Sequence, residues 1–263
     1  MSAVLTRKVV EKVWGRSNLP THYGVPDGRK IGEIWFEPMP GHDDHLVKIL
    51  FSSEKLSVQV HPSQSDARRL GFGSRGKDEC WLVLDAEPGS KVALGLDEDY
   101  PSEAVRAAAL DGSIEDMLVW HEARAGDFFH VPAGTIHAIG PGLTILEIQQ
   151  NTDVTFRLFD YNRGRTLHVD HAMECAKLEP YAGCKKSGSK KHTGNRLIDT
   201  PALKVSMLDG AQTVVVDGTK LLIPLEGSAH IGTTKLKTHQ CAMVEPGETA
   251  VLSDDSRVVV VDI

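Results

Sequence analysis

One stretch of the chain, Ser57 to Glu79, combines strand-like alternation with side chains that bind metals. Gln59 and His61 stand two residues apart in SVQVHP, and residues two apart on a β-strand point to the same face. Glu79 follows in a second apolar run, KDECWLVL, which also predicts a strand. An amide oxygen, an imidazole and a carboxylate suit a borderline divalent metal, and one more ligand would complete a four-ligand site. The stretch therefore favours a β fold built around a metal.

The fourth ligand is predicted from Gly126 to His137 (GDFFHVPAGTIH), which indicates a strand, a Pro-Ala-Gly turn and a second strand. The spacing of its Gly, Pro, Gly and His resembles the second motif of the cupin barrels, whose first motif supplies His-x-His and then Glu. This chain has Gln59 in place of the first His, a longer gap before Glu79, and Pro141 where the family has Asn. The resemblance implies a mainly β fold with a jelly-roll-like cupin barrel.

The composition narrows the classes of function. The 263 residues are 41% hydrophobic and 25% charged, which is typical of a globular protein with a substantial core. A net charge of −7 and an aromatic content of 6% disfavour nucleic acid and anionic membrane as partners. We find neither an N-terminal signal segment nor an apolar run that could span a bilayer, and expect a cytoplasmic protein. The oligomeric state is left open.

The pattern of turns and strands predicts two β domains. We expect a catalytic cupin domain over residues 1–182, with a small helical insertion near residues 97–120. The lysine-rich segment 183–195 is interpreted as a linker. Residues 196–263 have many short strands and turns but no His-x-His pair followed by Glu, which predicts a smaller, metal-free, degenerate cupin-like β domain. A short helix, residues 62–71, is expected to fill the gap between His61 and the next ligand.

Three charged residues stand in apolar strands. Arg157, in TFRLF, is costly to bury without an anionic partner, so it either grips an anionic ligand or oxyanion or forms a salt bridge to a nearby Asp or Glu. Glu147, in LTILEIQ, is either a general base or a carboxylate paired with a lysine. Lys48, in LVKILF, either reaches water at a sheet edge or belongs to the site.

Four stretches together resemble type I phosphomannose isomerase (mannose-6-phosphate isomerase), in its short bacterial form. They are VQVHP from Val58, KDECW from Lys77, VPAGTIHA from Val131 and EIQQNTDVTFR from Glu147, and EKVWG from Glu11 resembles the family's start. The match covers residues 10–165, whereas the C-terminal third is similar only as a generic β domain. The resemblance implies interconversion of mannose 6-phosphate and fructose 6-phosphate with a bound zinc. It places the metal ligands on Gln59, His61, Glu79 and His137, the active-site arginine on Arg157 and a site lysine on Lys77.

The expected chemistry moves a proton between two sugar carbons through an enediol. A divalent metal, expected to be Zn²⁺, and Arg157 would steady negative charge on the sugar oxygens, and Glu147 is the candidate base. The substrate phosphate needs cations or backbone N–H groups, and Lys77, Lys48 and Arg163 are unranked candidates. Two alternatives use the same ligand set: an iron-dependent cupin oxygenase and a non-catalytic sugar-phosphate-binding cupin.

Overall fold

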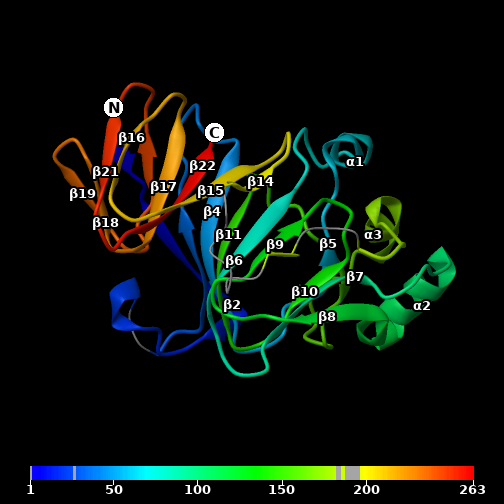
Figure 1. Cartoon of the computed structure of the whole chain (residues 1–263). Helices are drawn as coiled ribbons and strands as arrows, with labels where there is room; N and C mark the ends of the chain where they lie inside the picture. The colour runs from blue at the N-terminus through cyan, green and yellow to red at the C-terminus, as the bar shows by residue number, and fades with distance from the viewer. Residues whose placement is uncertain (1, 26–27, 182–184, 187–195) are drawn as a thin grey trace.

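The computed structural model describes residues 2–25, 28–181, 185–186 and 196–263, and this part of the chain is mainly β, as predicted (Figure 1). Its strands form four sheets. In spatial order the five-stranded sheet is β12 (Phe156–Phe159), β5 (Val58–Val60), β10 (His137–Ile139), β7 (Lys91–Leu96) and β8 (Leu118–Glu122). The seven-stranded sheet is β13 (Lys185–Lys186), β9 (Phe128–Val131), β6 (Glu79–Ala86), β11 (Leu143–Gln150), β4 (His45–Phe51), β3 (Ile31–Phe36) and β2 (Arg7–Arg16).

The C-terminal part of the chain supplies most of the other two sheets. The six-stranded sheet is β1 (Ala3–Val4), β20 (Ala242–Val244), β17 (Lys220–Glu226), β22 (Arg257–Asp262), β15 (Lys204–Asp209) and β14 (Arg196–Asp199). The four-stranded sheet is β16 (Gln212–Val215), β21 (Thr249–Leu252), β18 (Ser228–Ile231) and β19 (Thr234–Lys237). Because β1 pairs with β20, the first residues of the chain lie in the same sheet as its last strand.

Short helices complete the described structure. They are α1 (Gln64–Arg69), α2 (Ser102–Asp111), α3 (Val169–Cys175) and the 3₁₀ turns η1 (Thr21–Tyr23) and η2 (Ser113–Met117). Of these, α1 and the α2–η2 pair lie where the sequence predicts them, whereas α3 and η1 were not predicted. Ser63 caps α1 by accepting a hydrogen bond from the backbone N–H of Asp66, and α2 ends at Gly112 in a left-handed conformation. Among the described residues, no helix has the length and apolar character needed to cross a membrane.

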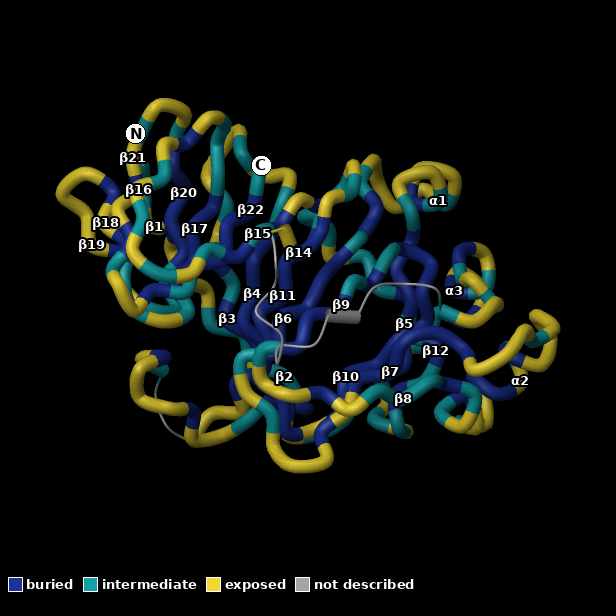
Figure 2. The backbone as a smooth tube through the Cα atoms, in the orientation of Figure 1, coloured by how far each residue is buried: buried dark blue, intermediate teal, exposed yellow. Residues whose placement is uncertain are grey.

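The elements stack in layers that are joined by four hydrophobic clusters (Figures 1 and 2). Helices α2 and α3 pack on the outer face of the five-stranded sheet. The inner face of that sheet packs on the seven-stranded sheet, and the two share an apolar cluster. The other face of the seven-stranded sheet packs on the six-stranded sheet, which in turn covers the four-stranded sheet. The central strands of the seven-stranded sheet, such as β4 and β11, are therefore buried on both faces.

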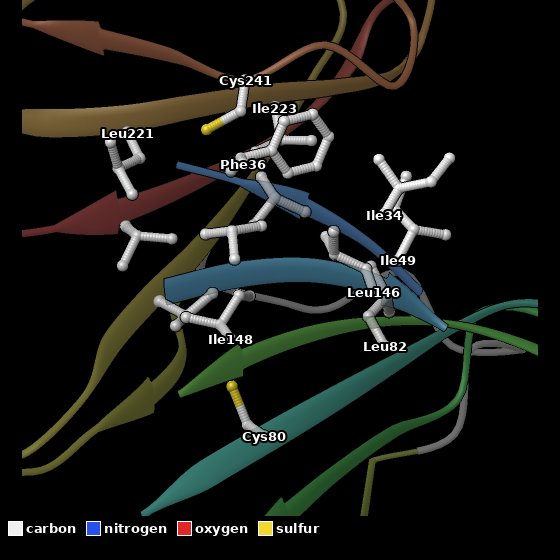
Figure 3. Close-up of a cluster of buried hydrophobic side chains, with 14 of the residues drawn as sticks. Ile34, Phe36, Ile49, Cys80, Leu82, Leu146, Ile148, Leu221, Ile223 and Cys241 are labelled. Carbon is white, nitrogen blue, oxygen red and sulfur yellow. The ribbon is translucent and has the colours of Figure 1, made fainter. Parts of the chain in front are cut away.

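Strand β11 shows how the sequence satisfies burial on both faces. Leu146 and Ile148 point toward the six-stranded sheet and join the cluster that contains Ile223 (Figure 3). The alternate positions, which include Ile145 and Glu147, share the opposite face and point toward the five-stranded sheet. The strand therefore reads as a mostly apolar run, in which Glu147 and Gln149 are the polar residues of the inner face.

The predicted linker, residues 183–195, lies largely outside the described residues, apart from the strand pairing of Lys185 with Phe129. The division into domains at 1–182 and 196–263 stays a prediction. Three of the four cysteines are described, Cys80, Cys175 and Cys241, and all three are buried and free.

Candidate active site

The four predicted metal ligands converge between the five-stranded and seven-stranded sheets. Gln59 is the central residue of β5, and His61 follows the end of that strand. His137 begins β10 and is the Cα partner of Gln59 across the antiparallel pair. Glu79 begins β6, on the facing sheet. Two strands of one sheet and one strand of the other therefore bring the ligands together.

The imidazole and carboxylate groups lie at ligand-sharing distances. His61 Nε2 is 3.5 Å from Glu79 Oε2, and His137 Nε2 is 3.4 Å from Glu79 Oε1. All three side chains are 1% exposed. Neighbouring ligand atoms of a tetrahedral zinc ion, at bond lengths of about 2.0–2.1 Å, lie roughly 3.3 Å apart. The spacing of the three groups thus fits a shared divalent cation.

Hydrogen bonds fix which nitrogen of each imidazole faces the centre. His61 Nδ1 donates to the carbonyl of Val154 at 3.0 Å, and His137 Nδ1 donates to the carbonyl of Thr135 at 2.9 Å. Burial lowers the pKa of His137 to about 4, and burial with the nearby Lys77 charge holds the pKa of His61 well below its ordinary value. Both rings are therefore neutral at pH 7 and present an Nε2 lone pair to the centre.

Glu79 supplies a second test of whether a metal fits. Both carboxylate oxygens are buried and accept no hydrogen bond from the described residues, although Lys77 Nζ lies 3.1 Å from Oε2 as an ion pair. Burial raises the pKa of Glu79 to about 7, Glu147 adds to the rise and Lys77 opposes it. A buried carboxylate without hydrogen bonds is costly, and a divalent cation at its oxygens would remove that cost and favour the ionised form.

Gln59 lies beside both imidazoles. Its Nε2 is 3.2 Å from His137 Nε2 and 3.5 Å from His61 Nε2, while its Oε1 accepts a hydrogen bond from Ser57 Oγ at 3.1 Å. A half-turn of the amide would exchange the two atoms and place Oε1 at the centre, and Ser57 Oγ would then accept from Nε2. Gln59 is thus positioned to act as the fourth ligand through oxygen.

The Pro-Ala-Gly turn holds the ligand strands in register. Gly134 has a φ of 85° and donates its N–H to the carbonyl of His61 at 2.8 Å. A Cβ at this position would lie 2.9 Å from the carbonyl oxygen of Cys175. The backbone N–H of Ala133 donates to Asp78 Oδ1 at 3.2 Å, next to Glu79. The turn that positions His137 is therefore also hydrogen-bonded to the segments that carry His61 and Glu79.

Two lysines and two glutamates form a charged cluster beside the ligands. Lys77 Nζ is 3.1 Å from His61 Nε2, in addition to its ion pair with Glu79. Lys48 Nζ is 3.3 Å from Glu147 Oε1 and donates to Gln149 Oε1 at 2.6 Å. Lys48 is 3% exposed and lies in the interior of the seven-stranded sheet, not at a sheet edge. These buried charges therefore compensate one another.

Glu147 is both a site residue and a paired carboxylate. Trp81 Nε1 donates to its Oε2 at 3.2 Å, and Lys48 pairs with its other oxygen. Burial raises the pKa of Glu147, but Lys48 and Lys77 outweigh burial and leave the pKa below its ordinary value. The carboxylate is ionised at neutral pH and is held in one orientation.

A polar cavity of about 120 Å³ opens beside the ligands. Its lining consists of Lys12, Trp14, Glu33, Lys48, Leu50, Leu56, Ser57, Gln59, Lys77, Ile139, Glu147, Asp153, Thr155, Arg157 and Arg165. Arg157 is the Cα partner of Gln59 on β12, next to the candidate metal ligands. Its Nε is buried and has no hydrogen-bond partner in the described part of the chain. Among the described residues Arg157 forms no ion pair, so the predicted alternative of a salt bridge is not seen. Asp160, which pairs with Arg165, and Asp153 raise the pKa of Arg157 only through longer-range electrostatics.

The structure brings eight of the nine predicted site residues together and places Arg163 elsewhere. Arg163 donates to the carbonyl of Lys55 at 2.7 Å and lies outside the cavity lining. Sequence reasoning missed Arg165, two residues later, because the intervening turn cannot be read from strand alternation. It also missed Lys12 and Trp14, although their spacing of two within EKVWG predicts a shared face.

Comparisons with known proteins show which proteins this chain resembles in sequence and in fold. No family model matches the chain. A Bacillus subtilis protein described as a probable mannose-6-phosphate isomerase is 34% identical over 197 residues, which is 73% of this chain and 58% of the relative. The chain spans 42–58% of the length of the curated relatives it matches.

The similarity in fold extends over the whole chain. The crystal structure of a mannose 6-phosphate isomerase from Bacillus subtilis aligns over 99% of both chains, with a TM-score of 0.86 and 22% identity. A zinc-bound mannose 6-phosphate isomerase aligns over 99% of both chains, with a TM-score of 0.75 and 14% identity. The resemblance predicted from the motifs is thus confirmed, in sequence over most of the chain and in fold over its length.

Proposed function

We propose that this chain, a relative of the mannose-6-phosphate isomerases in both sequence and fold, interconverts mannose 6-phosphate and fructose 6-phosphate with the help of one zinc ion. The observation that carries the proposal is the convergence of Glu79 with the His61 and His137 imidazoles next to a cavity lined by Glu147 and Arg157. A metal-ligand set, an ionised carboxylate and an arginine without an ion-pair partner are the groups that an aldose–ketose isomerisation requires.

The reaction moves one proton between neighbouring carbons. Glu147 accepts the proton from C2 of the open-chain aldose, which gives an enediolate with its negative charge on O1. A proton then passes from O2 to O1, and Glu147 returns its own proton to C1 to give the ketose. The Lys48 ion pair and the Trp81 hydrogen bond keep this carboxylate ionised and in place while it does so. A low pKa makes it a weak base, so the acidity of the C2 proton must be raised by stabilising the negative charge that forms on the sugar oxygens.

Positive charge around the cavity provides that stabilisation. Arg157 approaches from β12, beside Gln59, and its guanidinium donates to a developing oxyanion. When bound at Gln59, His61, Glu79 and His137, the zinc ion supplies Lewis-acid stabilisation of the same charge. Lys77 contacts His61 and Glu79; with these ligands bound to a metal, its ammonium group would be available to Glu147, whose charge already acts on it.

The proposal is tested by measuring isomerisation directly. Purified protein loaded with zinc is mixed with mannose 6-phosphate, and fructose 6-phosphate is quantified over time. We expect turnover that falls to background after chelation, returns on adding zinc, and is lost in His137→Ala. His130→Ala is the matched control, because His130 is a nearby partly buried histidine outside the ligand set, and we expect it to retain turnover.

Other outcomes separate the alternative functions. Binding of mannose 6-phosphate without turnover in the zinc-loaded protein would contradict the isomerase and favour a binding cupin. Oxygen consumption with iron at the same ligands, in the absence of isomerisation, would favour an oxygenase. Full turnover in rigorously metal-free protein would remove the metal from the mechanism.

A further inference from the structure

The turn that follows β12 wraps two arginines around one buried carboxylate. Asp160 is 2% exposed, accepts a hydrogen bond from Arg165 Nε at 2.7 Å and accepts a second from Arg165 Nη2. Arg163 Nη1 lies 3.6 Å from the same carboxylate. Tyr161 and Asn162 both have φ values in the left-handed region, 53° and 54°. Non-glycine residues adopt that region at a cost, so this turn is held in a specific shape that presents its arginines.

The two arginines of the turn go to different places. Arg165 lines the cavity, with its side chain 29% exposed. Arg163 leaves the cavity, donates to the carbonyl of Lys55, lies 3.6 Å from Glu54 and packs its guanidinium 5.0 Å from the centre of the Tyr161 ring. The turn therefore delivers one cation to the cavity and uses the other to anchor itself.

The returning chain places Arg165 near Arg157. The N–H of His168 donates to the carbonyl of Arg157 at 2.7 Å, and the N–H of Arg157 donates to His168 Nδ1 at 3.3 Å. Burial and the charge of Arg165 lower the pKa of Arg157, while Asp160 and the exposed Asp153 oppose this only in part. Arg157 and Arg165 therefore lie near each other at this wall of the cavity, where Asp160 is paired with Arg165 and Asp153 is exposed.

The other cations of the cavity are already engaged. Lys48 pairs with Glu147, Lys77 pairs with Glu79, and Lys12 lies 3.3 Å from Glu33. An arginine has five N–H donors in a planar fork. Arg165 uses two of them, on Nε and Nη2, to donate hydrogen bonds to Asp160. Its Nη1 group and remaining Nη2 proton make no hydrogen bond within the described residues, and they suit the bidentate contact that a phosphate prefers.

We propose that Arg165, oriented by Asp160, binds the phosphate group of the substrate, with Arg157 between it and the metal ligands. The inference rests on the proposed function, because it assigns the two ends of a sugar phosphate to two ends of the cavity. Arg157 is opposite Gln59 and stabilises charge at the reacting carbons. The partly exposed Arg165 binds the phosphate at the far end of the sugar. Arg163, the sequence-based candidate for this role, becomes a structural anchor.

The test compares Arg165→Gln with Arg163→Gln, a matched control from the same turn. The readouts are kcat and KM for mannose 6-phosphate and the Kd of inorganic phosphate by calorimetry, both on the zinc-loaded full chain. For Arg165→Gln we expect both KM and the phosphate Kd to rise by at least about tenfold, as expected for the loss of a charge-assisted contact, with a smaller change in kcat. For Arg163→Gln we expect less than about a twofold change in either constant.

A second variant guards against a folding defect. Arg165→Gln leaves Asp160 buried without its main partner, so the double variant Asp160→Asn with Arg165→Gln removes both charges and is measured alongside it. A folded double variant that binds phosphate as tightly as the parent protein would overturn the inference. An equal loss in Arg163→Gln, or a tenfold loss in Lys12→Gln with none in Arg165→Gln, would overturn it as well.

The phosphate titration also separates this inference from the proposed function. Isomerisation by the parent protein combined with Arg165-independent phosphate binding would contradict only the phosphate assignment. Arg165-dependent phosphate binding without any isomerisation would contradict only the isomerase.

Discussion

The first β region of this molecule holds the candidate site, and the second comprises the strands after residue 195. The two are similar in architecture but differ in how many polar and charged residues they bury. Each consists of two facing sheets with an apolar cluster between them. Of the buried polar and charged residues in the described part of the chain, only Ser256 lies after residue 195. The first region instead buries His61, Glu79 and Glu147 among its strands. Burying charge without compensation costs several kcal/mol, so a region that does so repeatedly is organised around those groups and not around stability alone.

The second region supports the first through the seven-stranded sheet. Strand β11 carries Glu147 on one face and Leu146 on the other, and the leucine packs toward Ile223 of the six-stranded sheet. In β6, Cys80 points into the same apolar cluster (Figure 3), while the preceding residue, Glu79, belongs to the candidate metal site. In the seven-stranded sheet, the face toward the five-stranded sheet holds the residues of the site, and the face toward the six-stranded sheet contributes stability. Each prediction below tests the role of one region or face.

The largest effect is expected from two adjacent residues of β6. Glu79→Gln should weaken zinc binding and isomerisation by more than about a hundredfold, because it removes a charged ligand, whereas losing a mere partner of a ligand costs roughly 10- to 100-fold. Cys80→Ala, on the opposite face, should leave zinc affinity unchanged and lower only the free energy of unfolding. Zinc titration and urea unfolding of both variants measure this. Equal loss of zinc in the two variants would contradict the division of faces.

The Lys48–Glu147 pair should be the next most sensitive feature. Lys48→Met leaves Glu147 buried with one oxygen unpaired, and breaking one partner of a buried pair costs about 3–5 kcal/mol of unfolding free energy. Adding Glu147→Gln should recover much of that loss while leaving the protein inactive. A double variant no more stable than Lys48→Met would show that the pair does not act as a unit.

The interface between the two regions should contribute stability without chemistry. Ile223→Ala removes a fully buried side chain from the cluster between the seven-stranded and six-stranded sheets, which costs about 2–5 kcal/mol. At temperatures where the variant stays folded, kcat and zinc affinity should match the parent protein. A folded Ile223→Ala protein with a tenfold lower kcat would mean that the six-stranded sheet shapes the site.

The smallest effect concerns acid and the second region. Burial, helped by the charge of nearby His22, lowers the pKa of His239 to about 4, against about 6.5 in the unfolded chain. The unfolded state therefore binds more protons between these values, and this residue's contribution to stability is full above pH 6.5 and is lost as the pH falls toward 4. His239 has a φ of 58°, which Asn tolerates, so His239→Asn should flatten the stability–pH curve in that window. The free energy of unfolding of the parent protein minus that of the variant, measured at each pH, isolates the contribution of His239. A difference that does not change with pH would contradict the lowered pKa of His239.

Much of the site could be predicted because it follows from strand alternation and local turns. The spacing of Gln59 and His61, the Pro-Ala-Gly turn before His137 and the apolar run around Glu147 each encode a side-chain direction locally. The short helix after His61 and its Ser63 cap were predictable for the same reason. The β fold class follows from the same patterns.

The rest depends on contacts between segments far apart in the chain. Arg163 and Arg165 are two residues apart, yet consecutive left-handed residues send them in different directions. Lys48 looks like an edge lysine until the register with β11 places it opposite Glu147. The cluster that joins the seven-stranded and six-stranded sheets has no local signature, because its residues are ordinary alternating apolar positions.

The central claim is that the buried histidine and glutamate centre of the first region is an isomerase metal site. The most direct measurement is a titration of metal-free protein with zinc in which bound zinc and fructose 6-phosphate formation are recorded on the same samples. We predict that turnover rises in proportion to bound zinc and saturates at one zinc per chain, and that Glu79→Gln shows neither. Undiminished turnover without metal, or a fully zinc-loaded protein that forms no fructose 6-phosphate, would contradict the account.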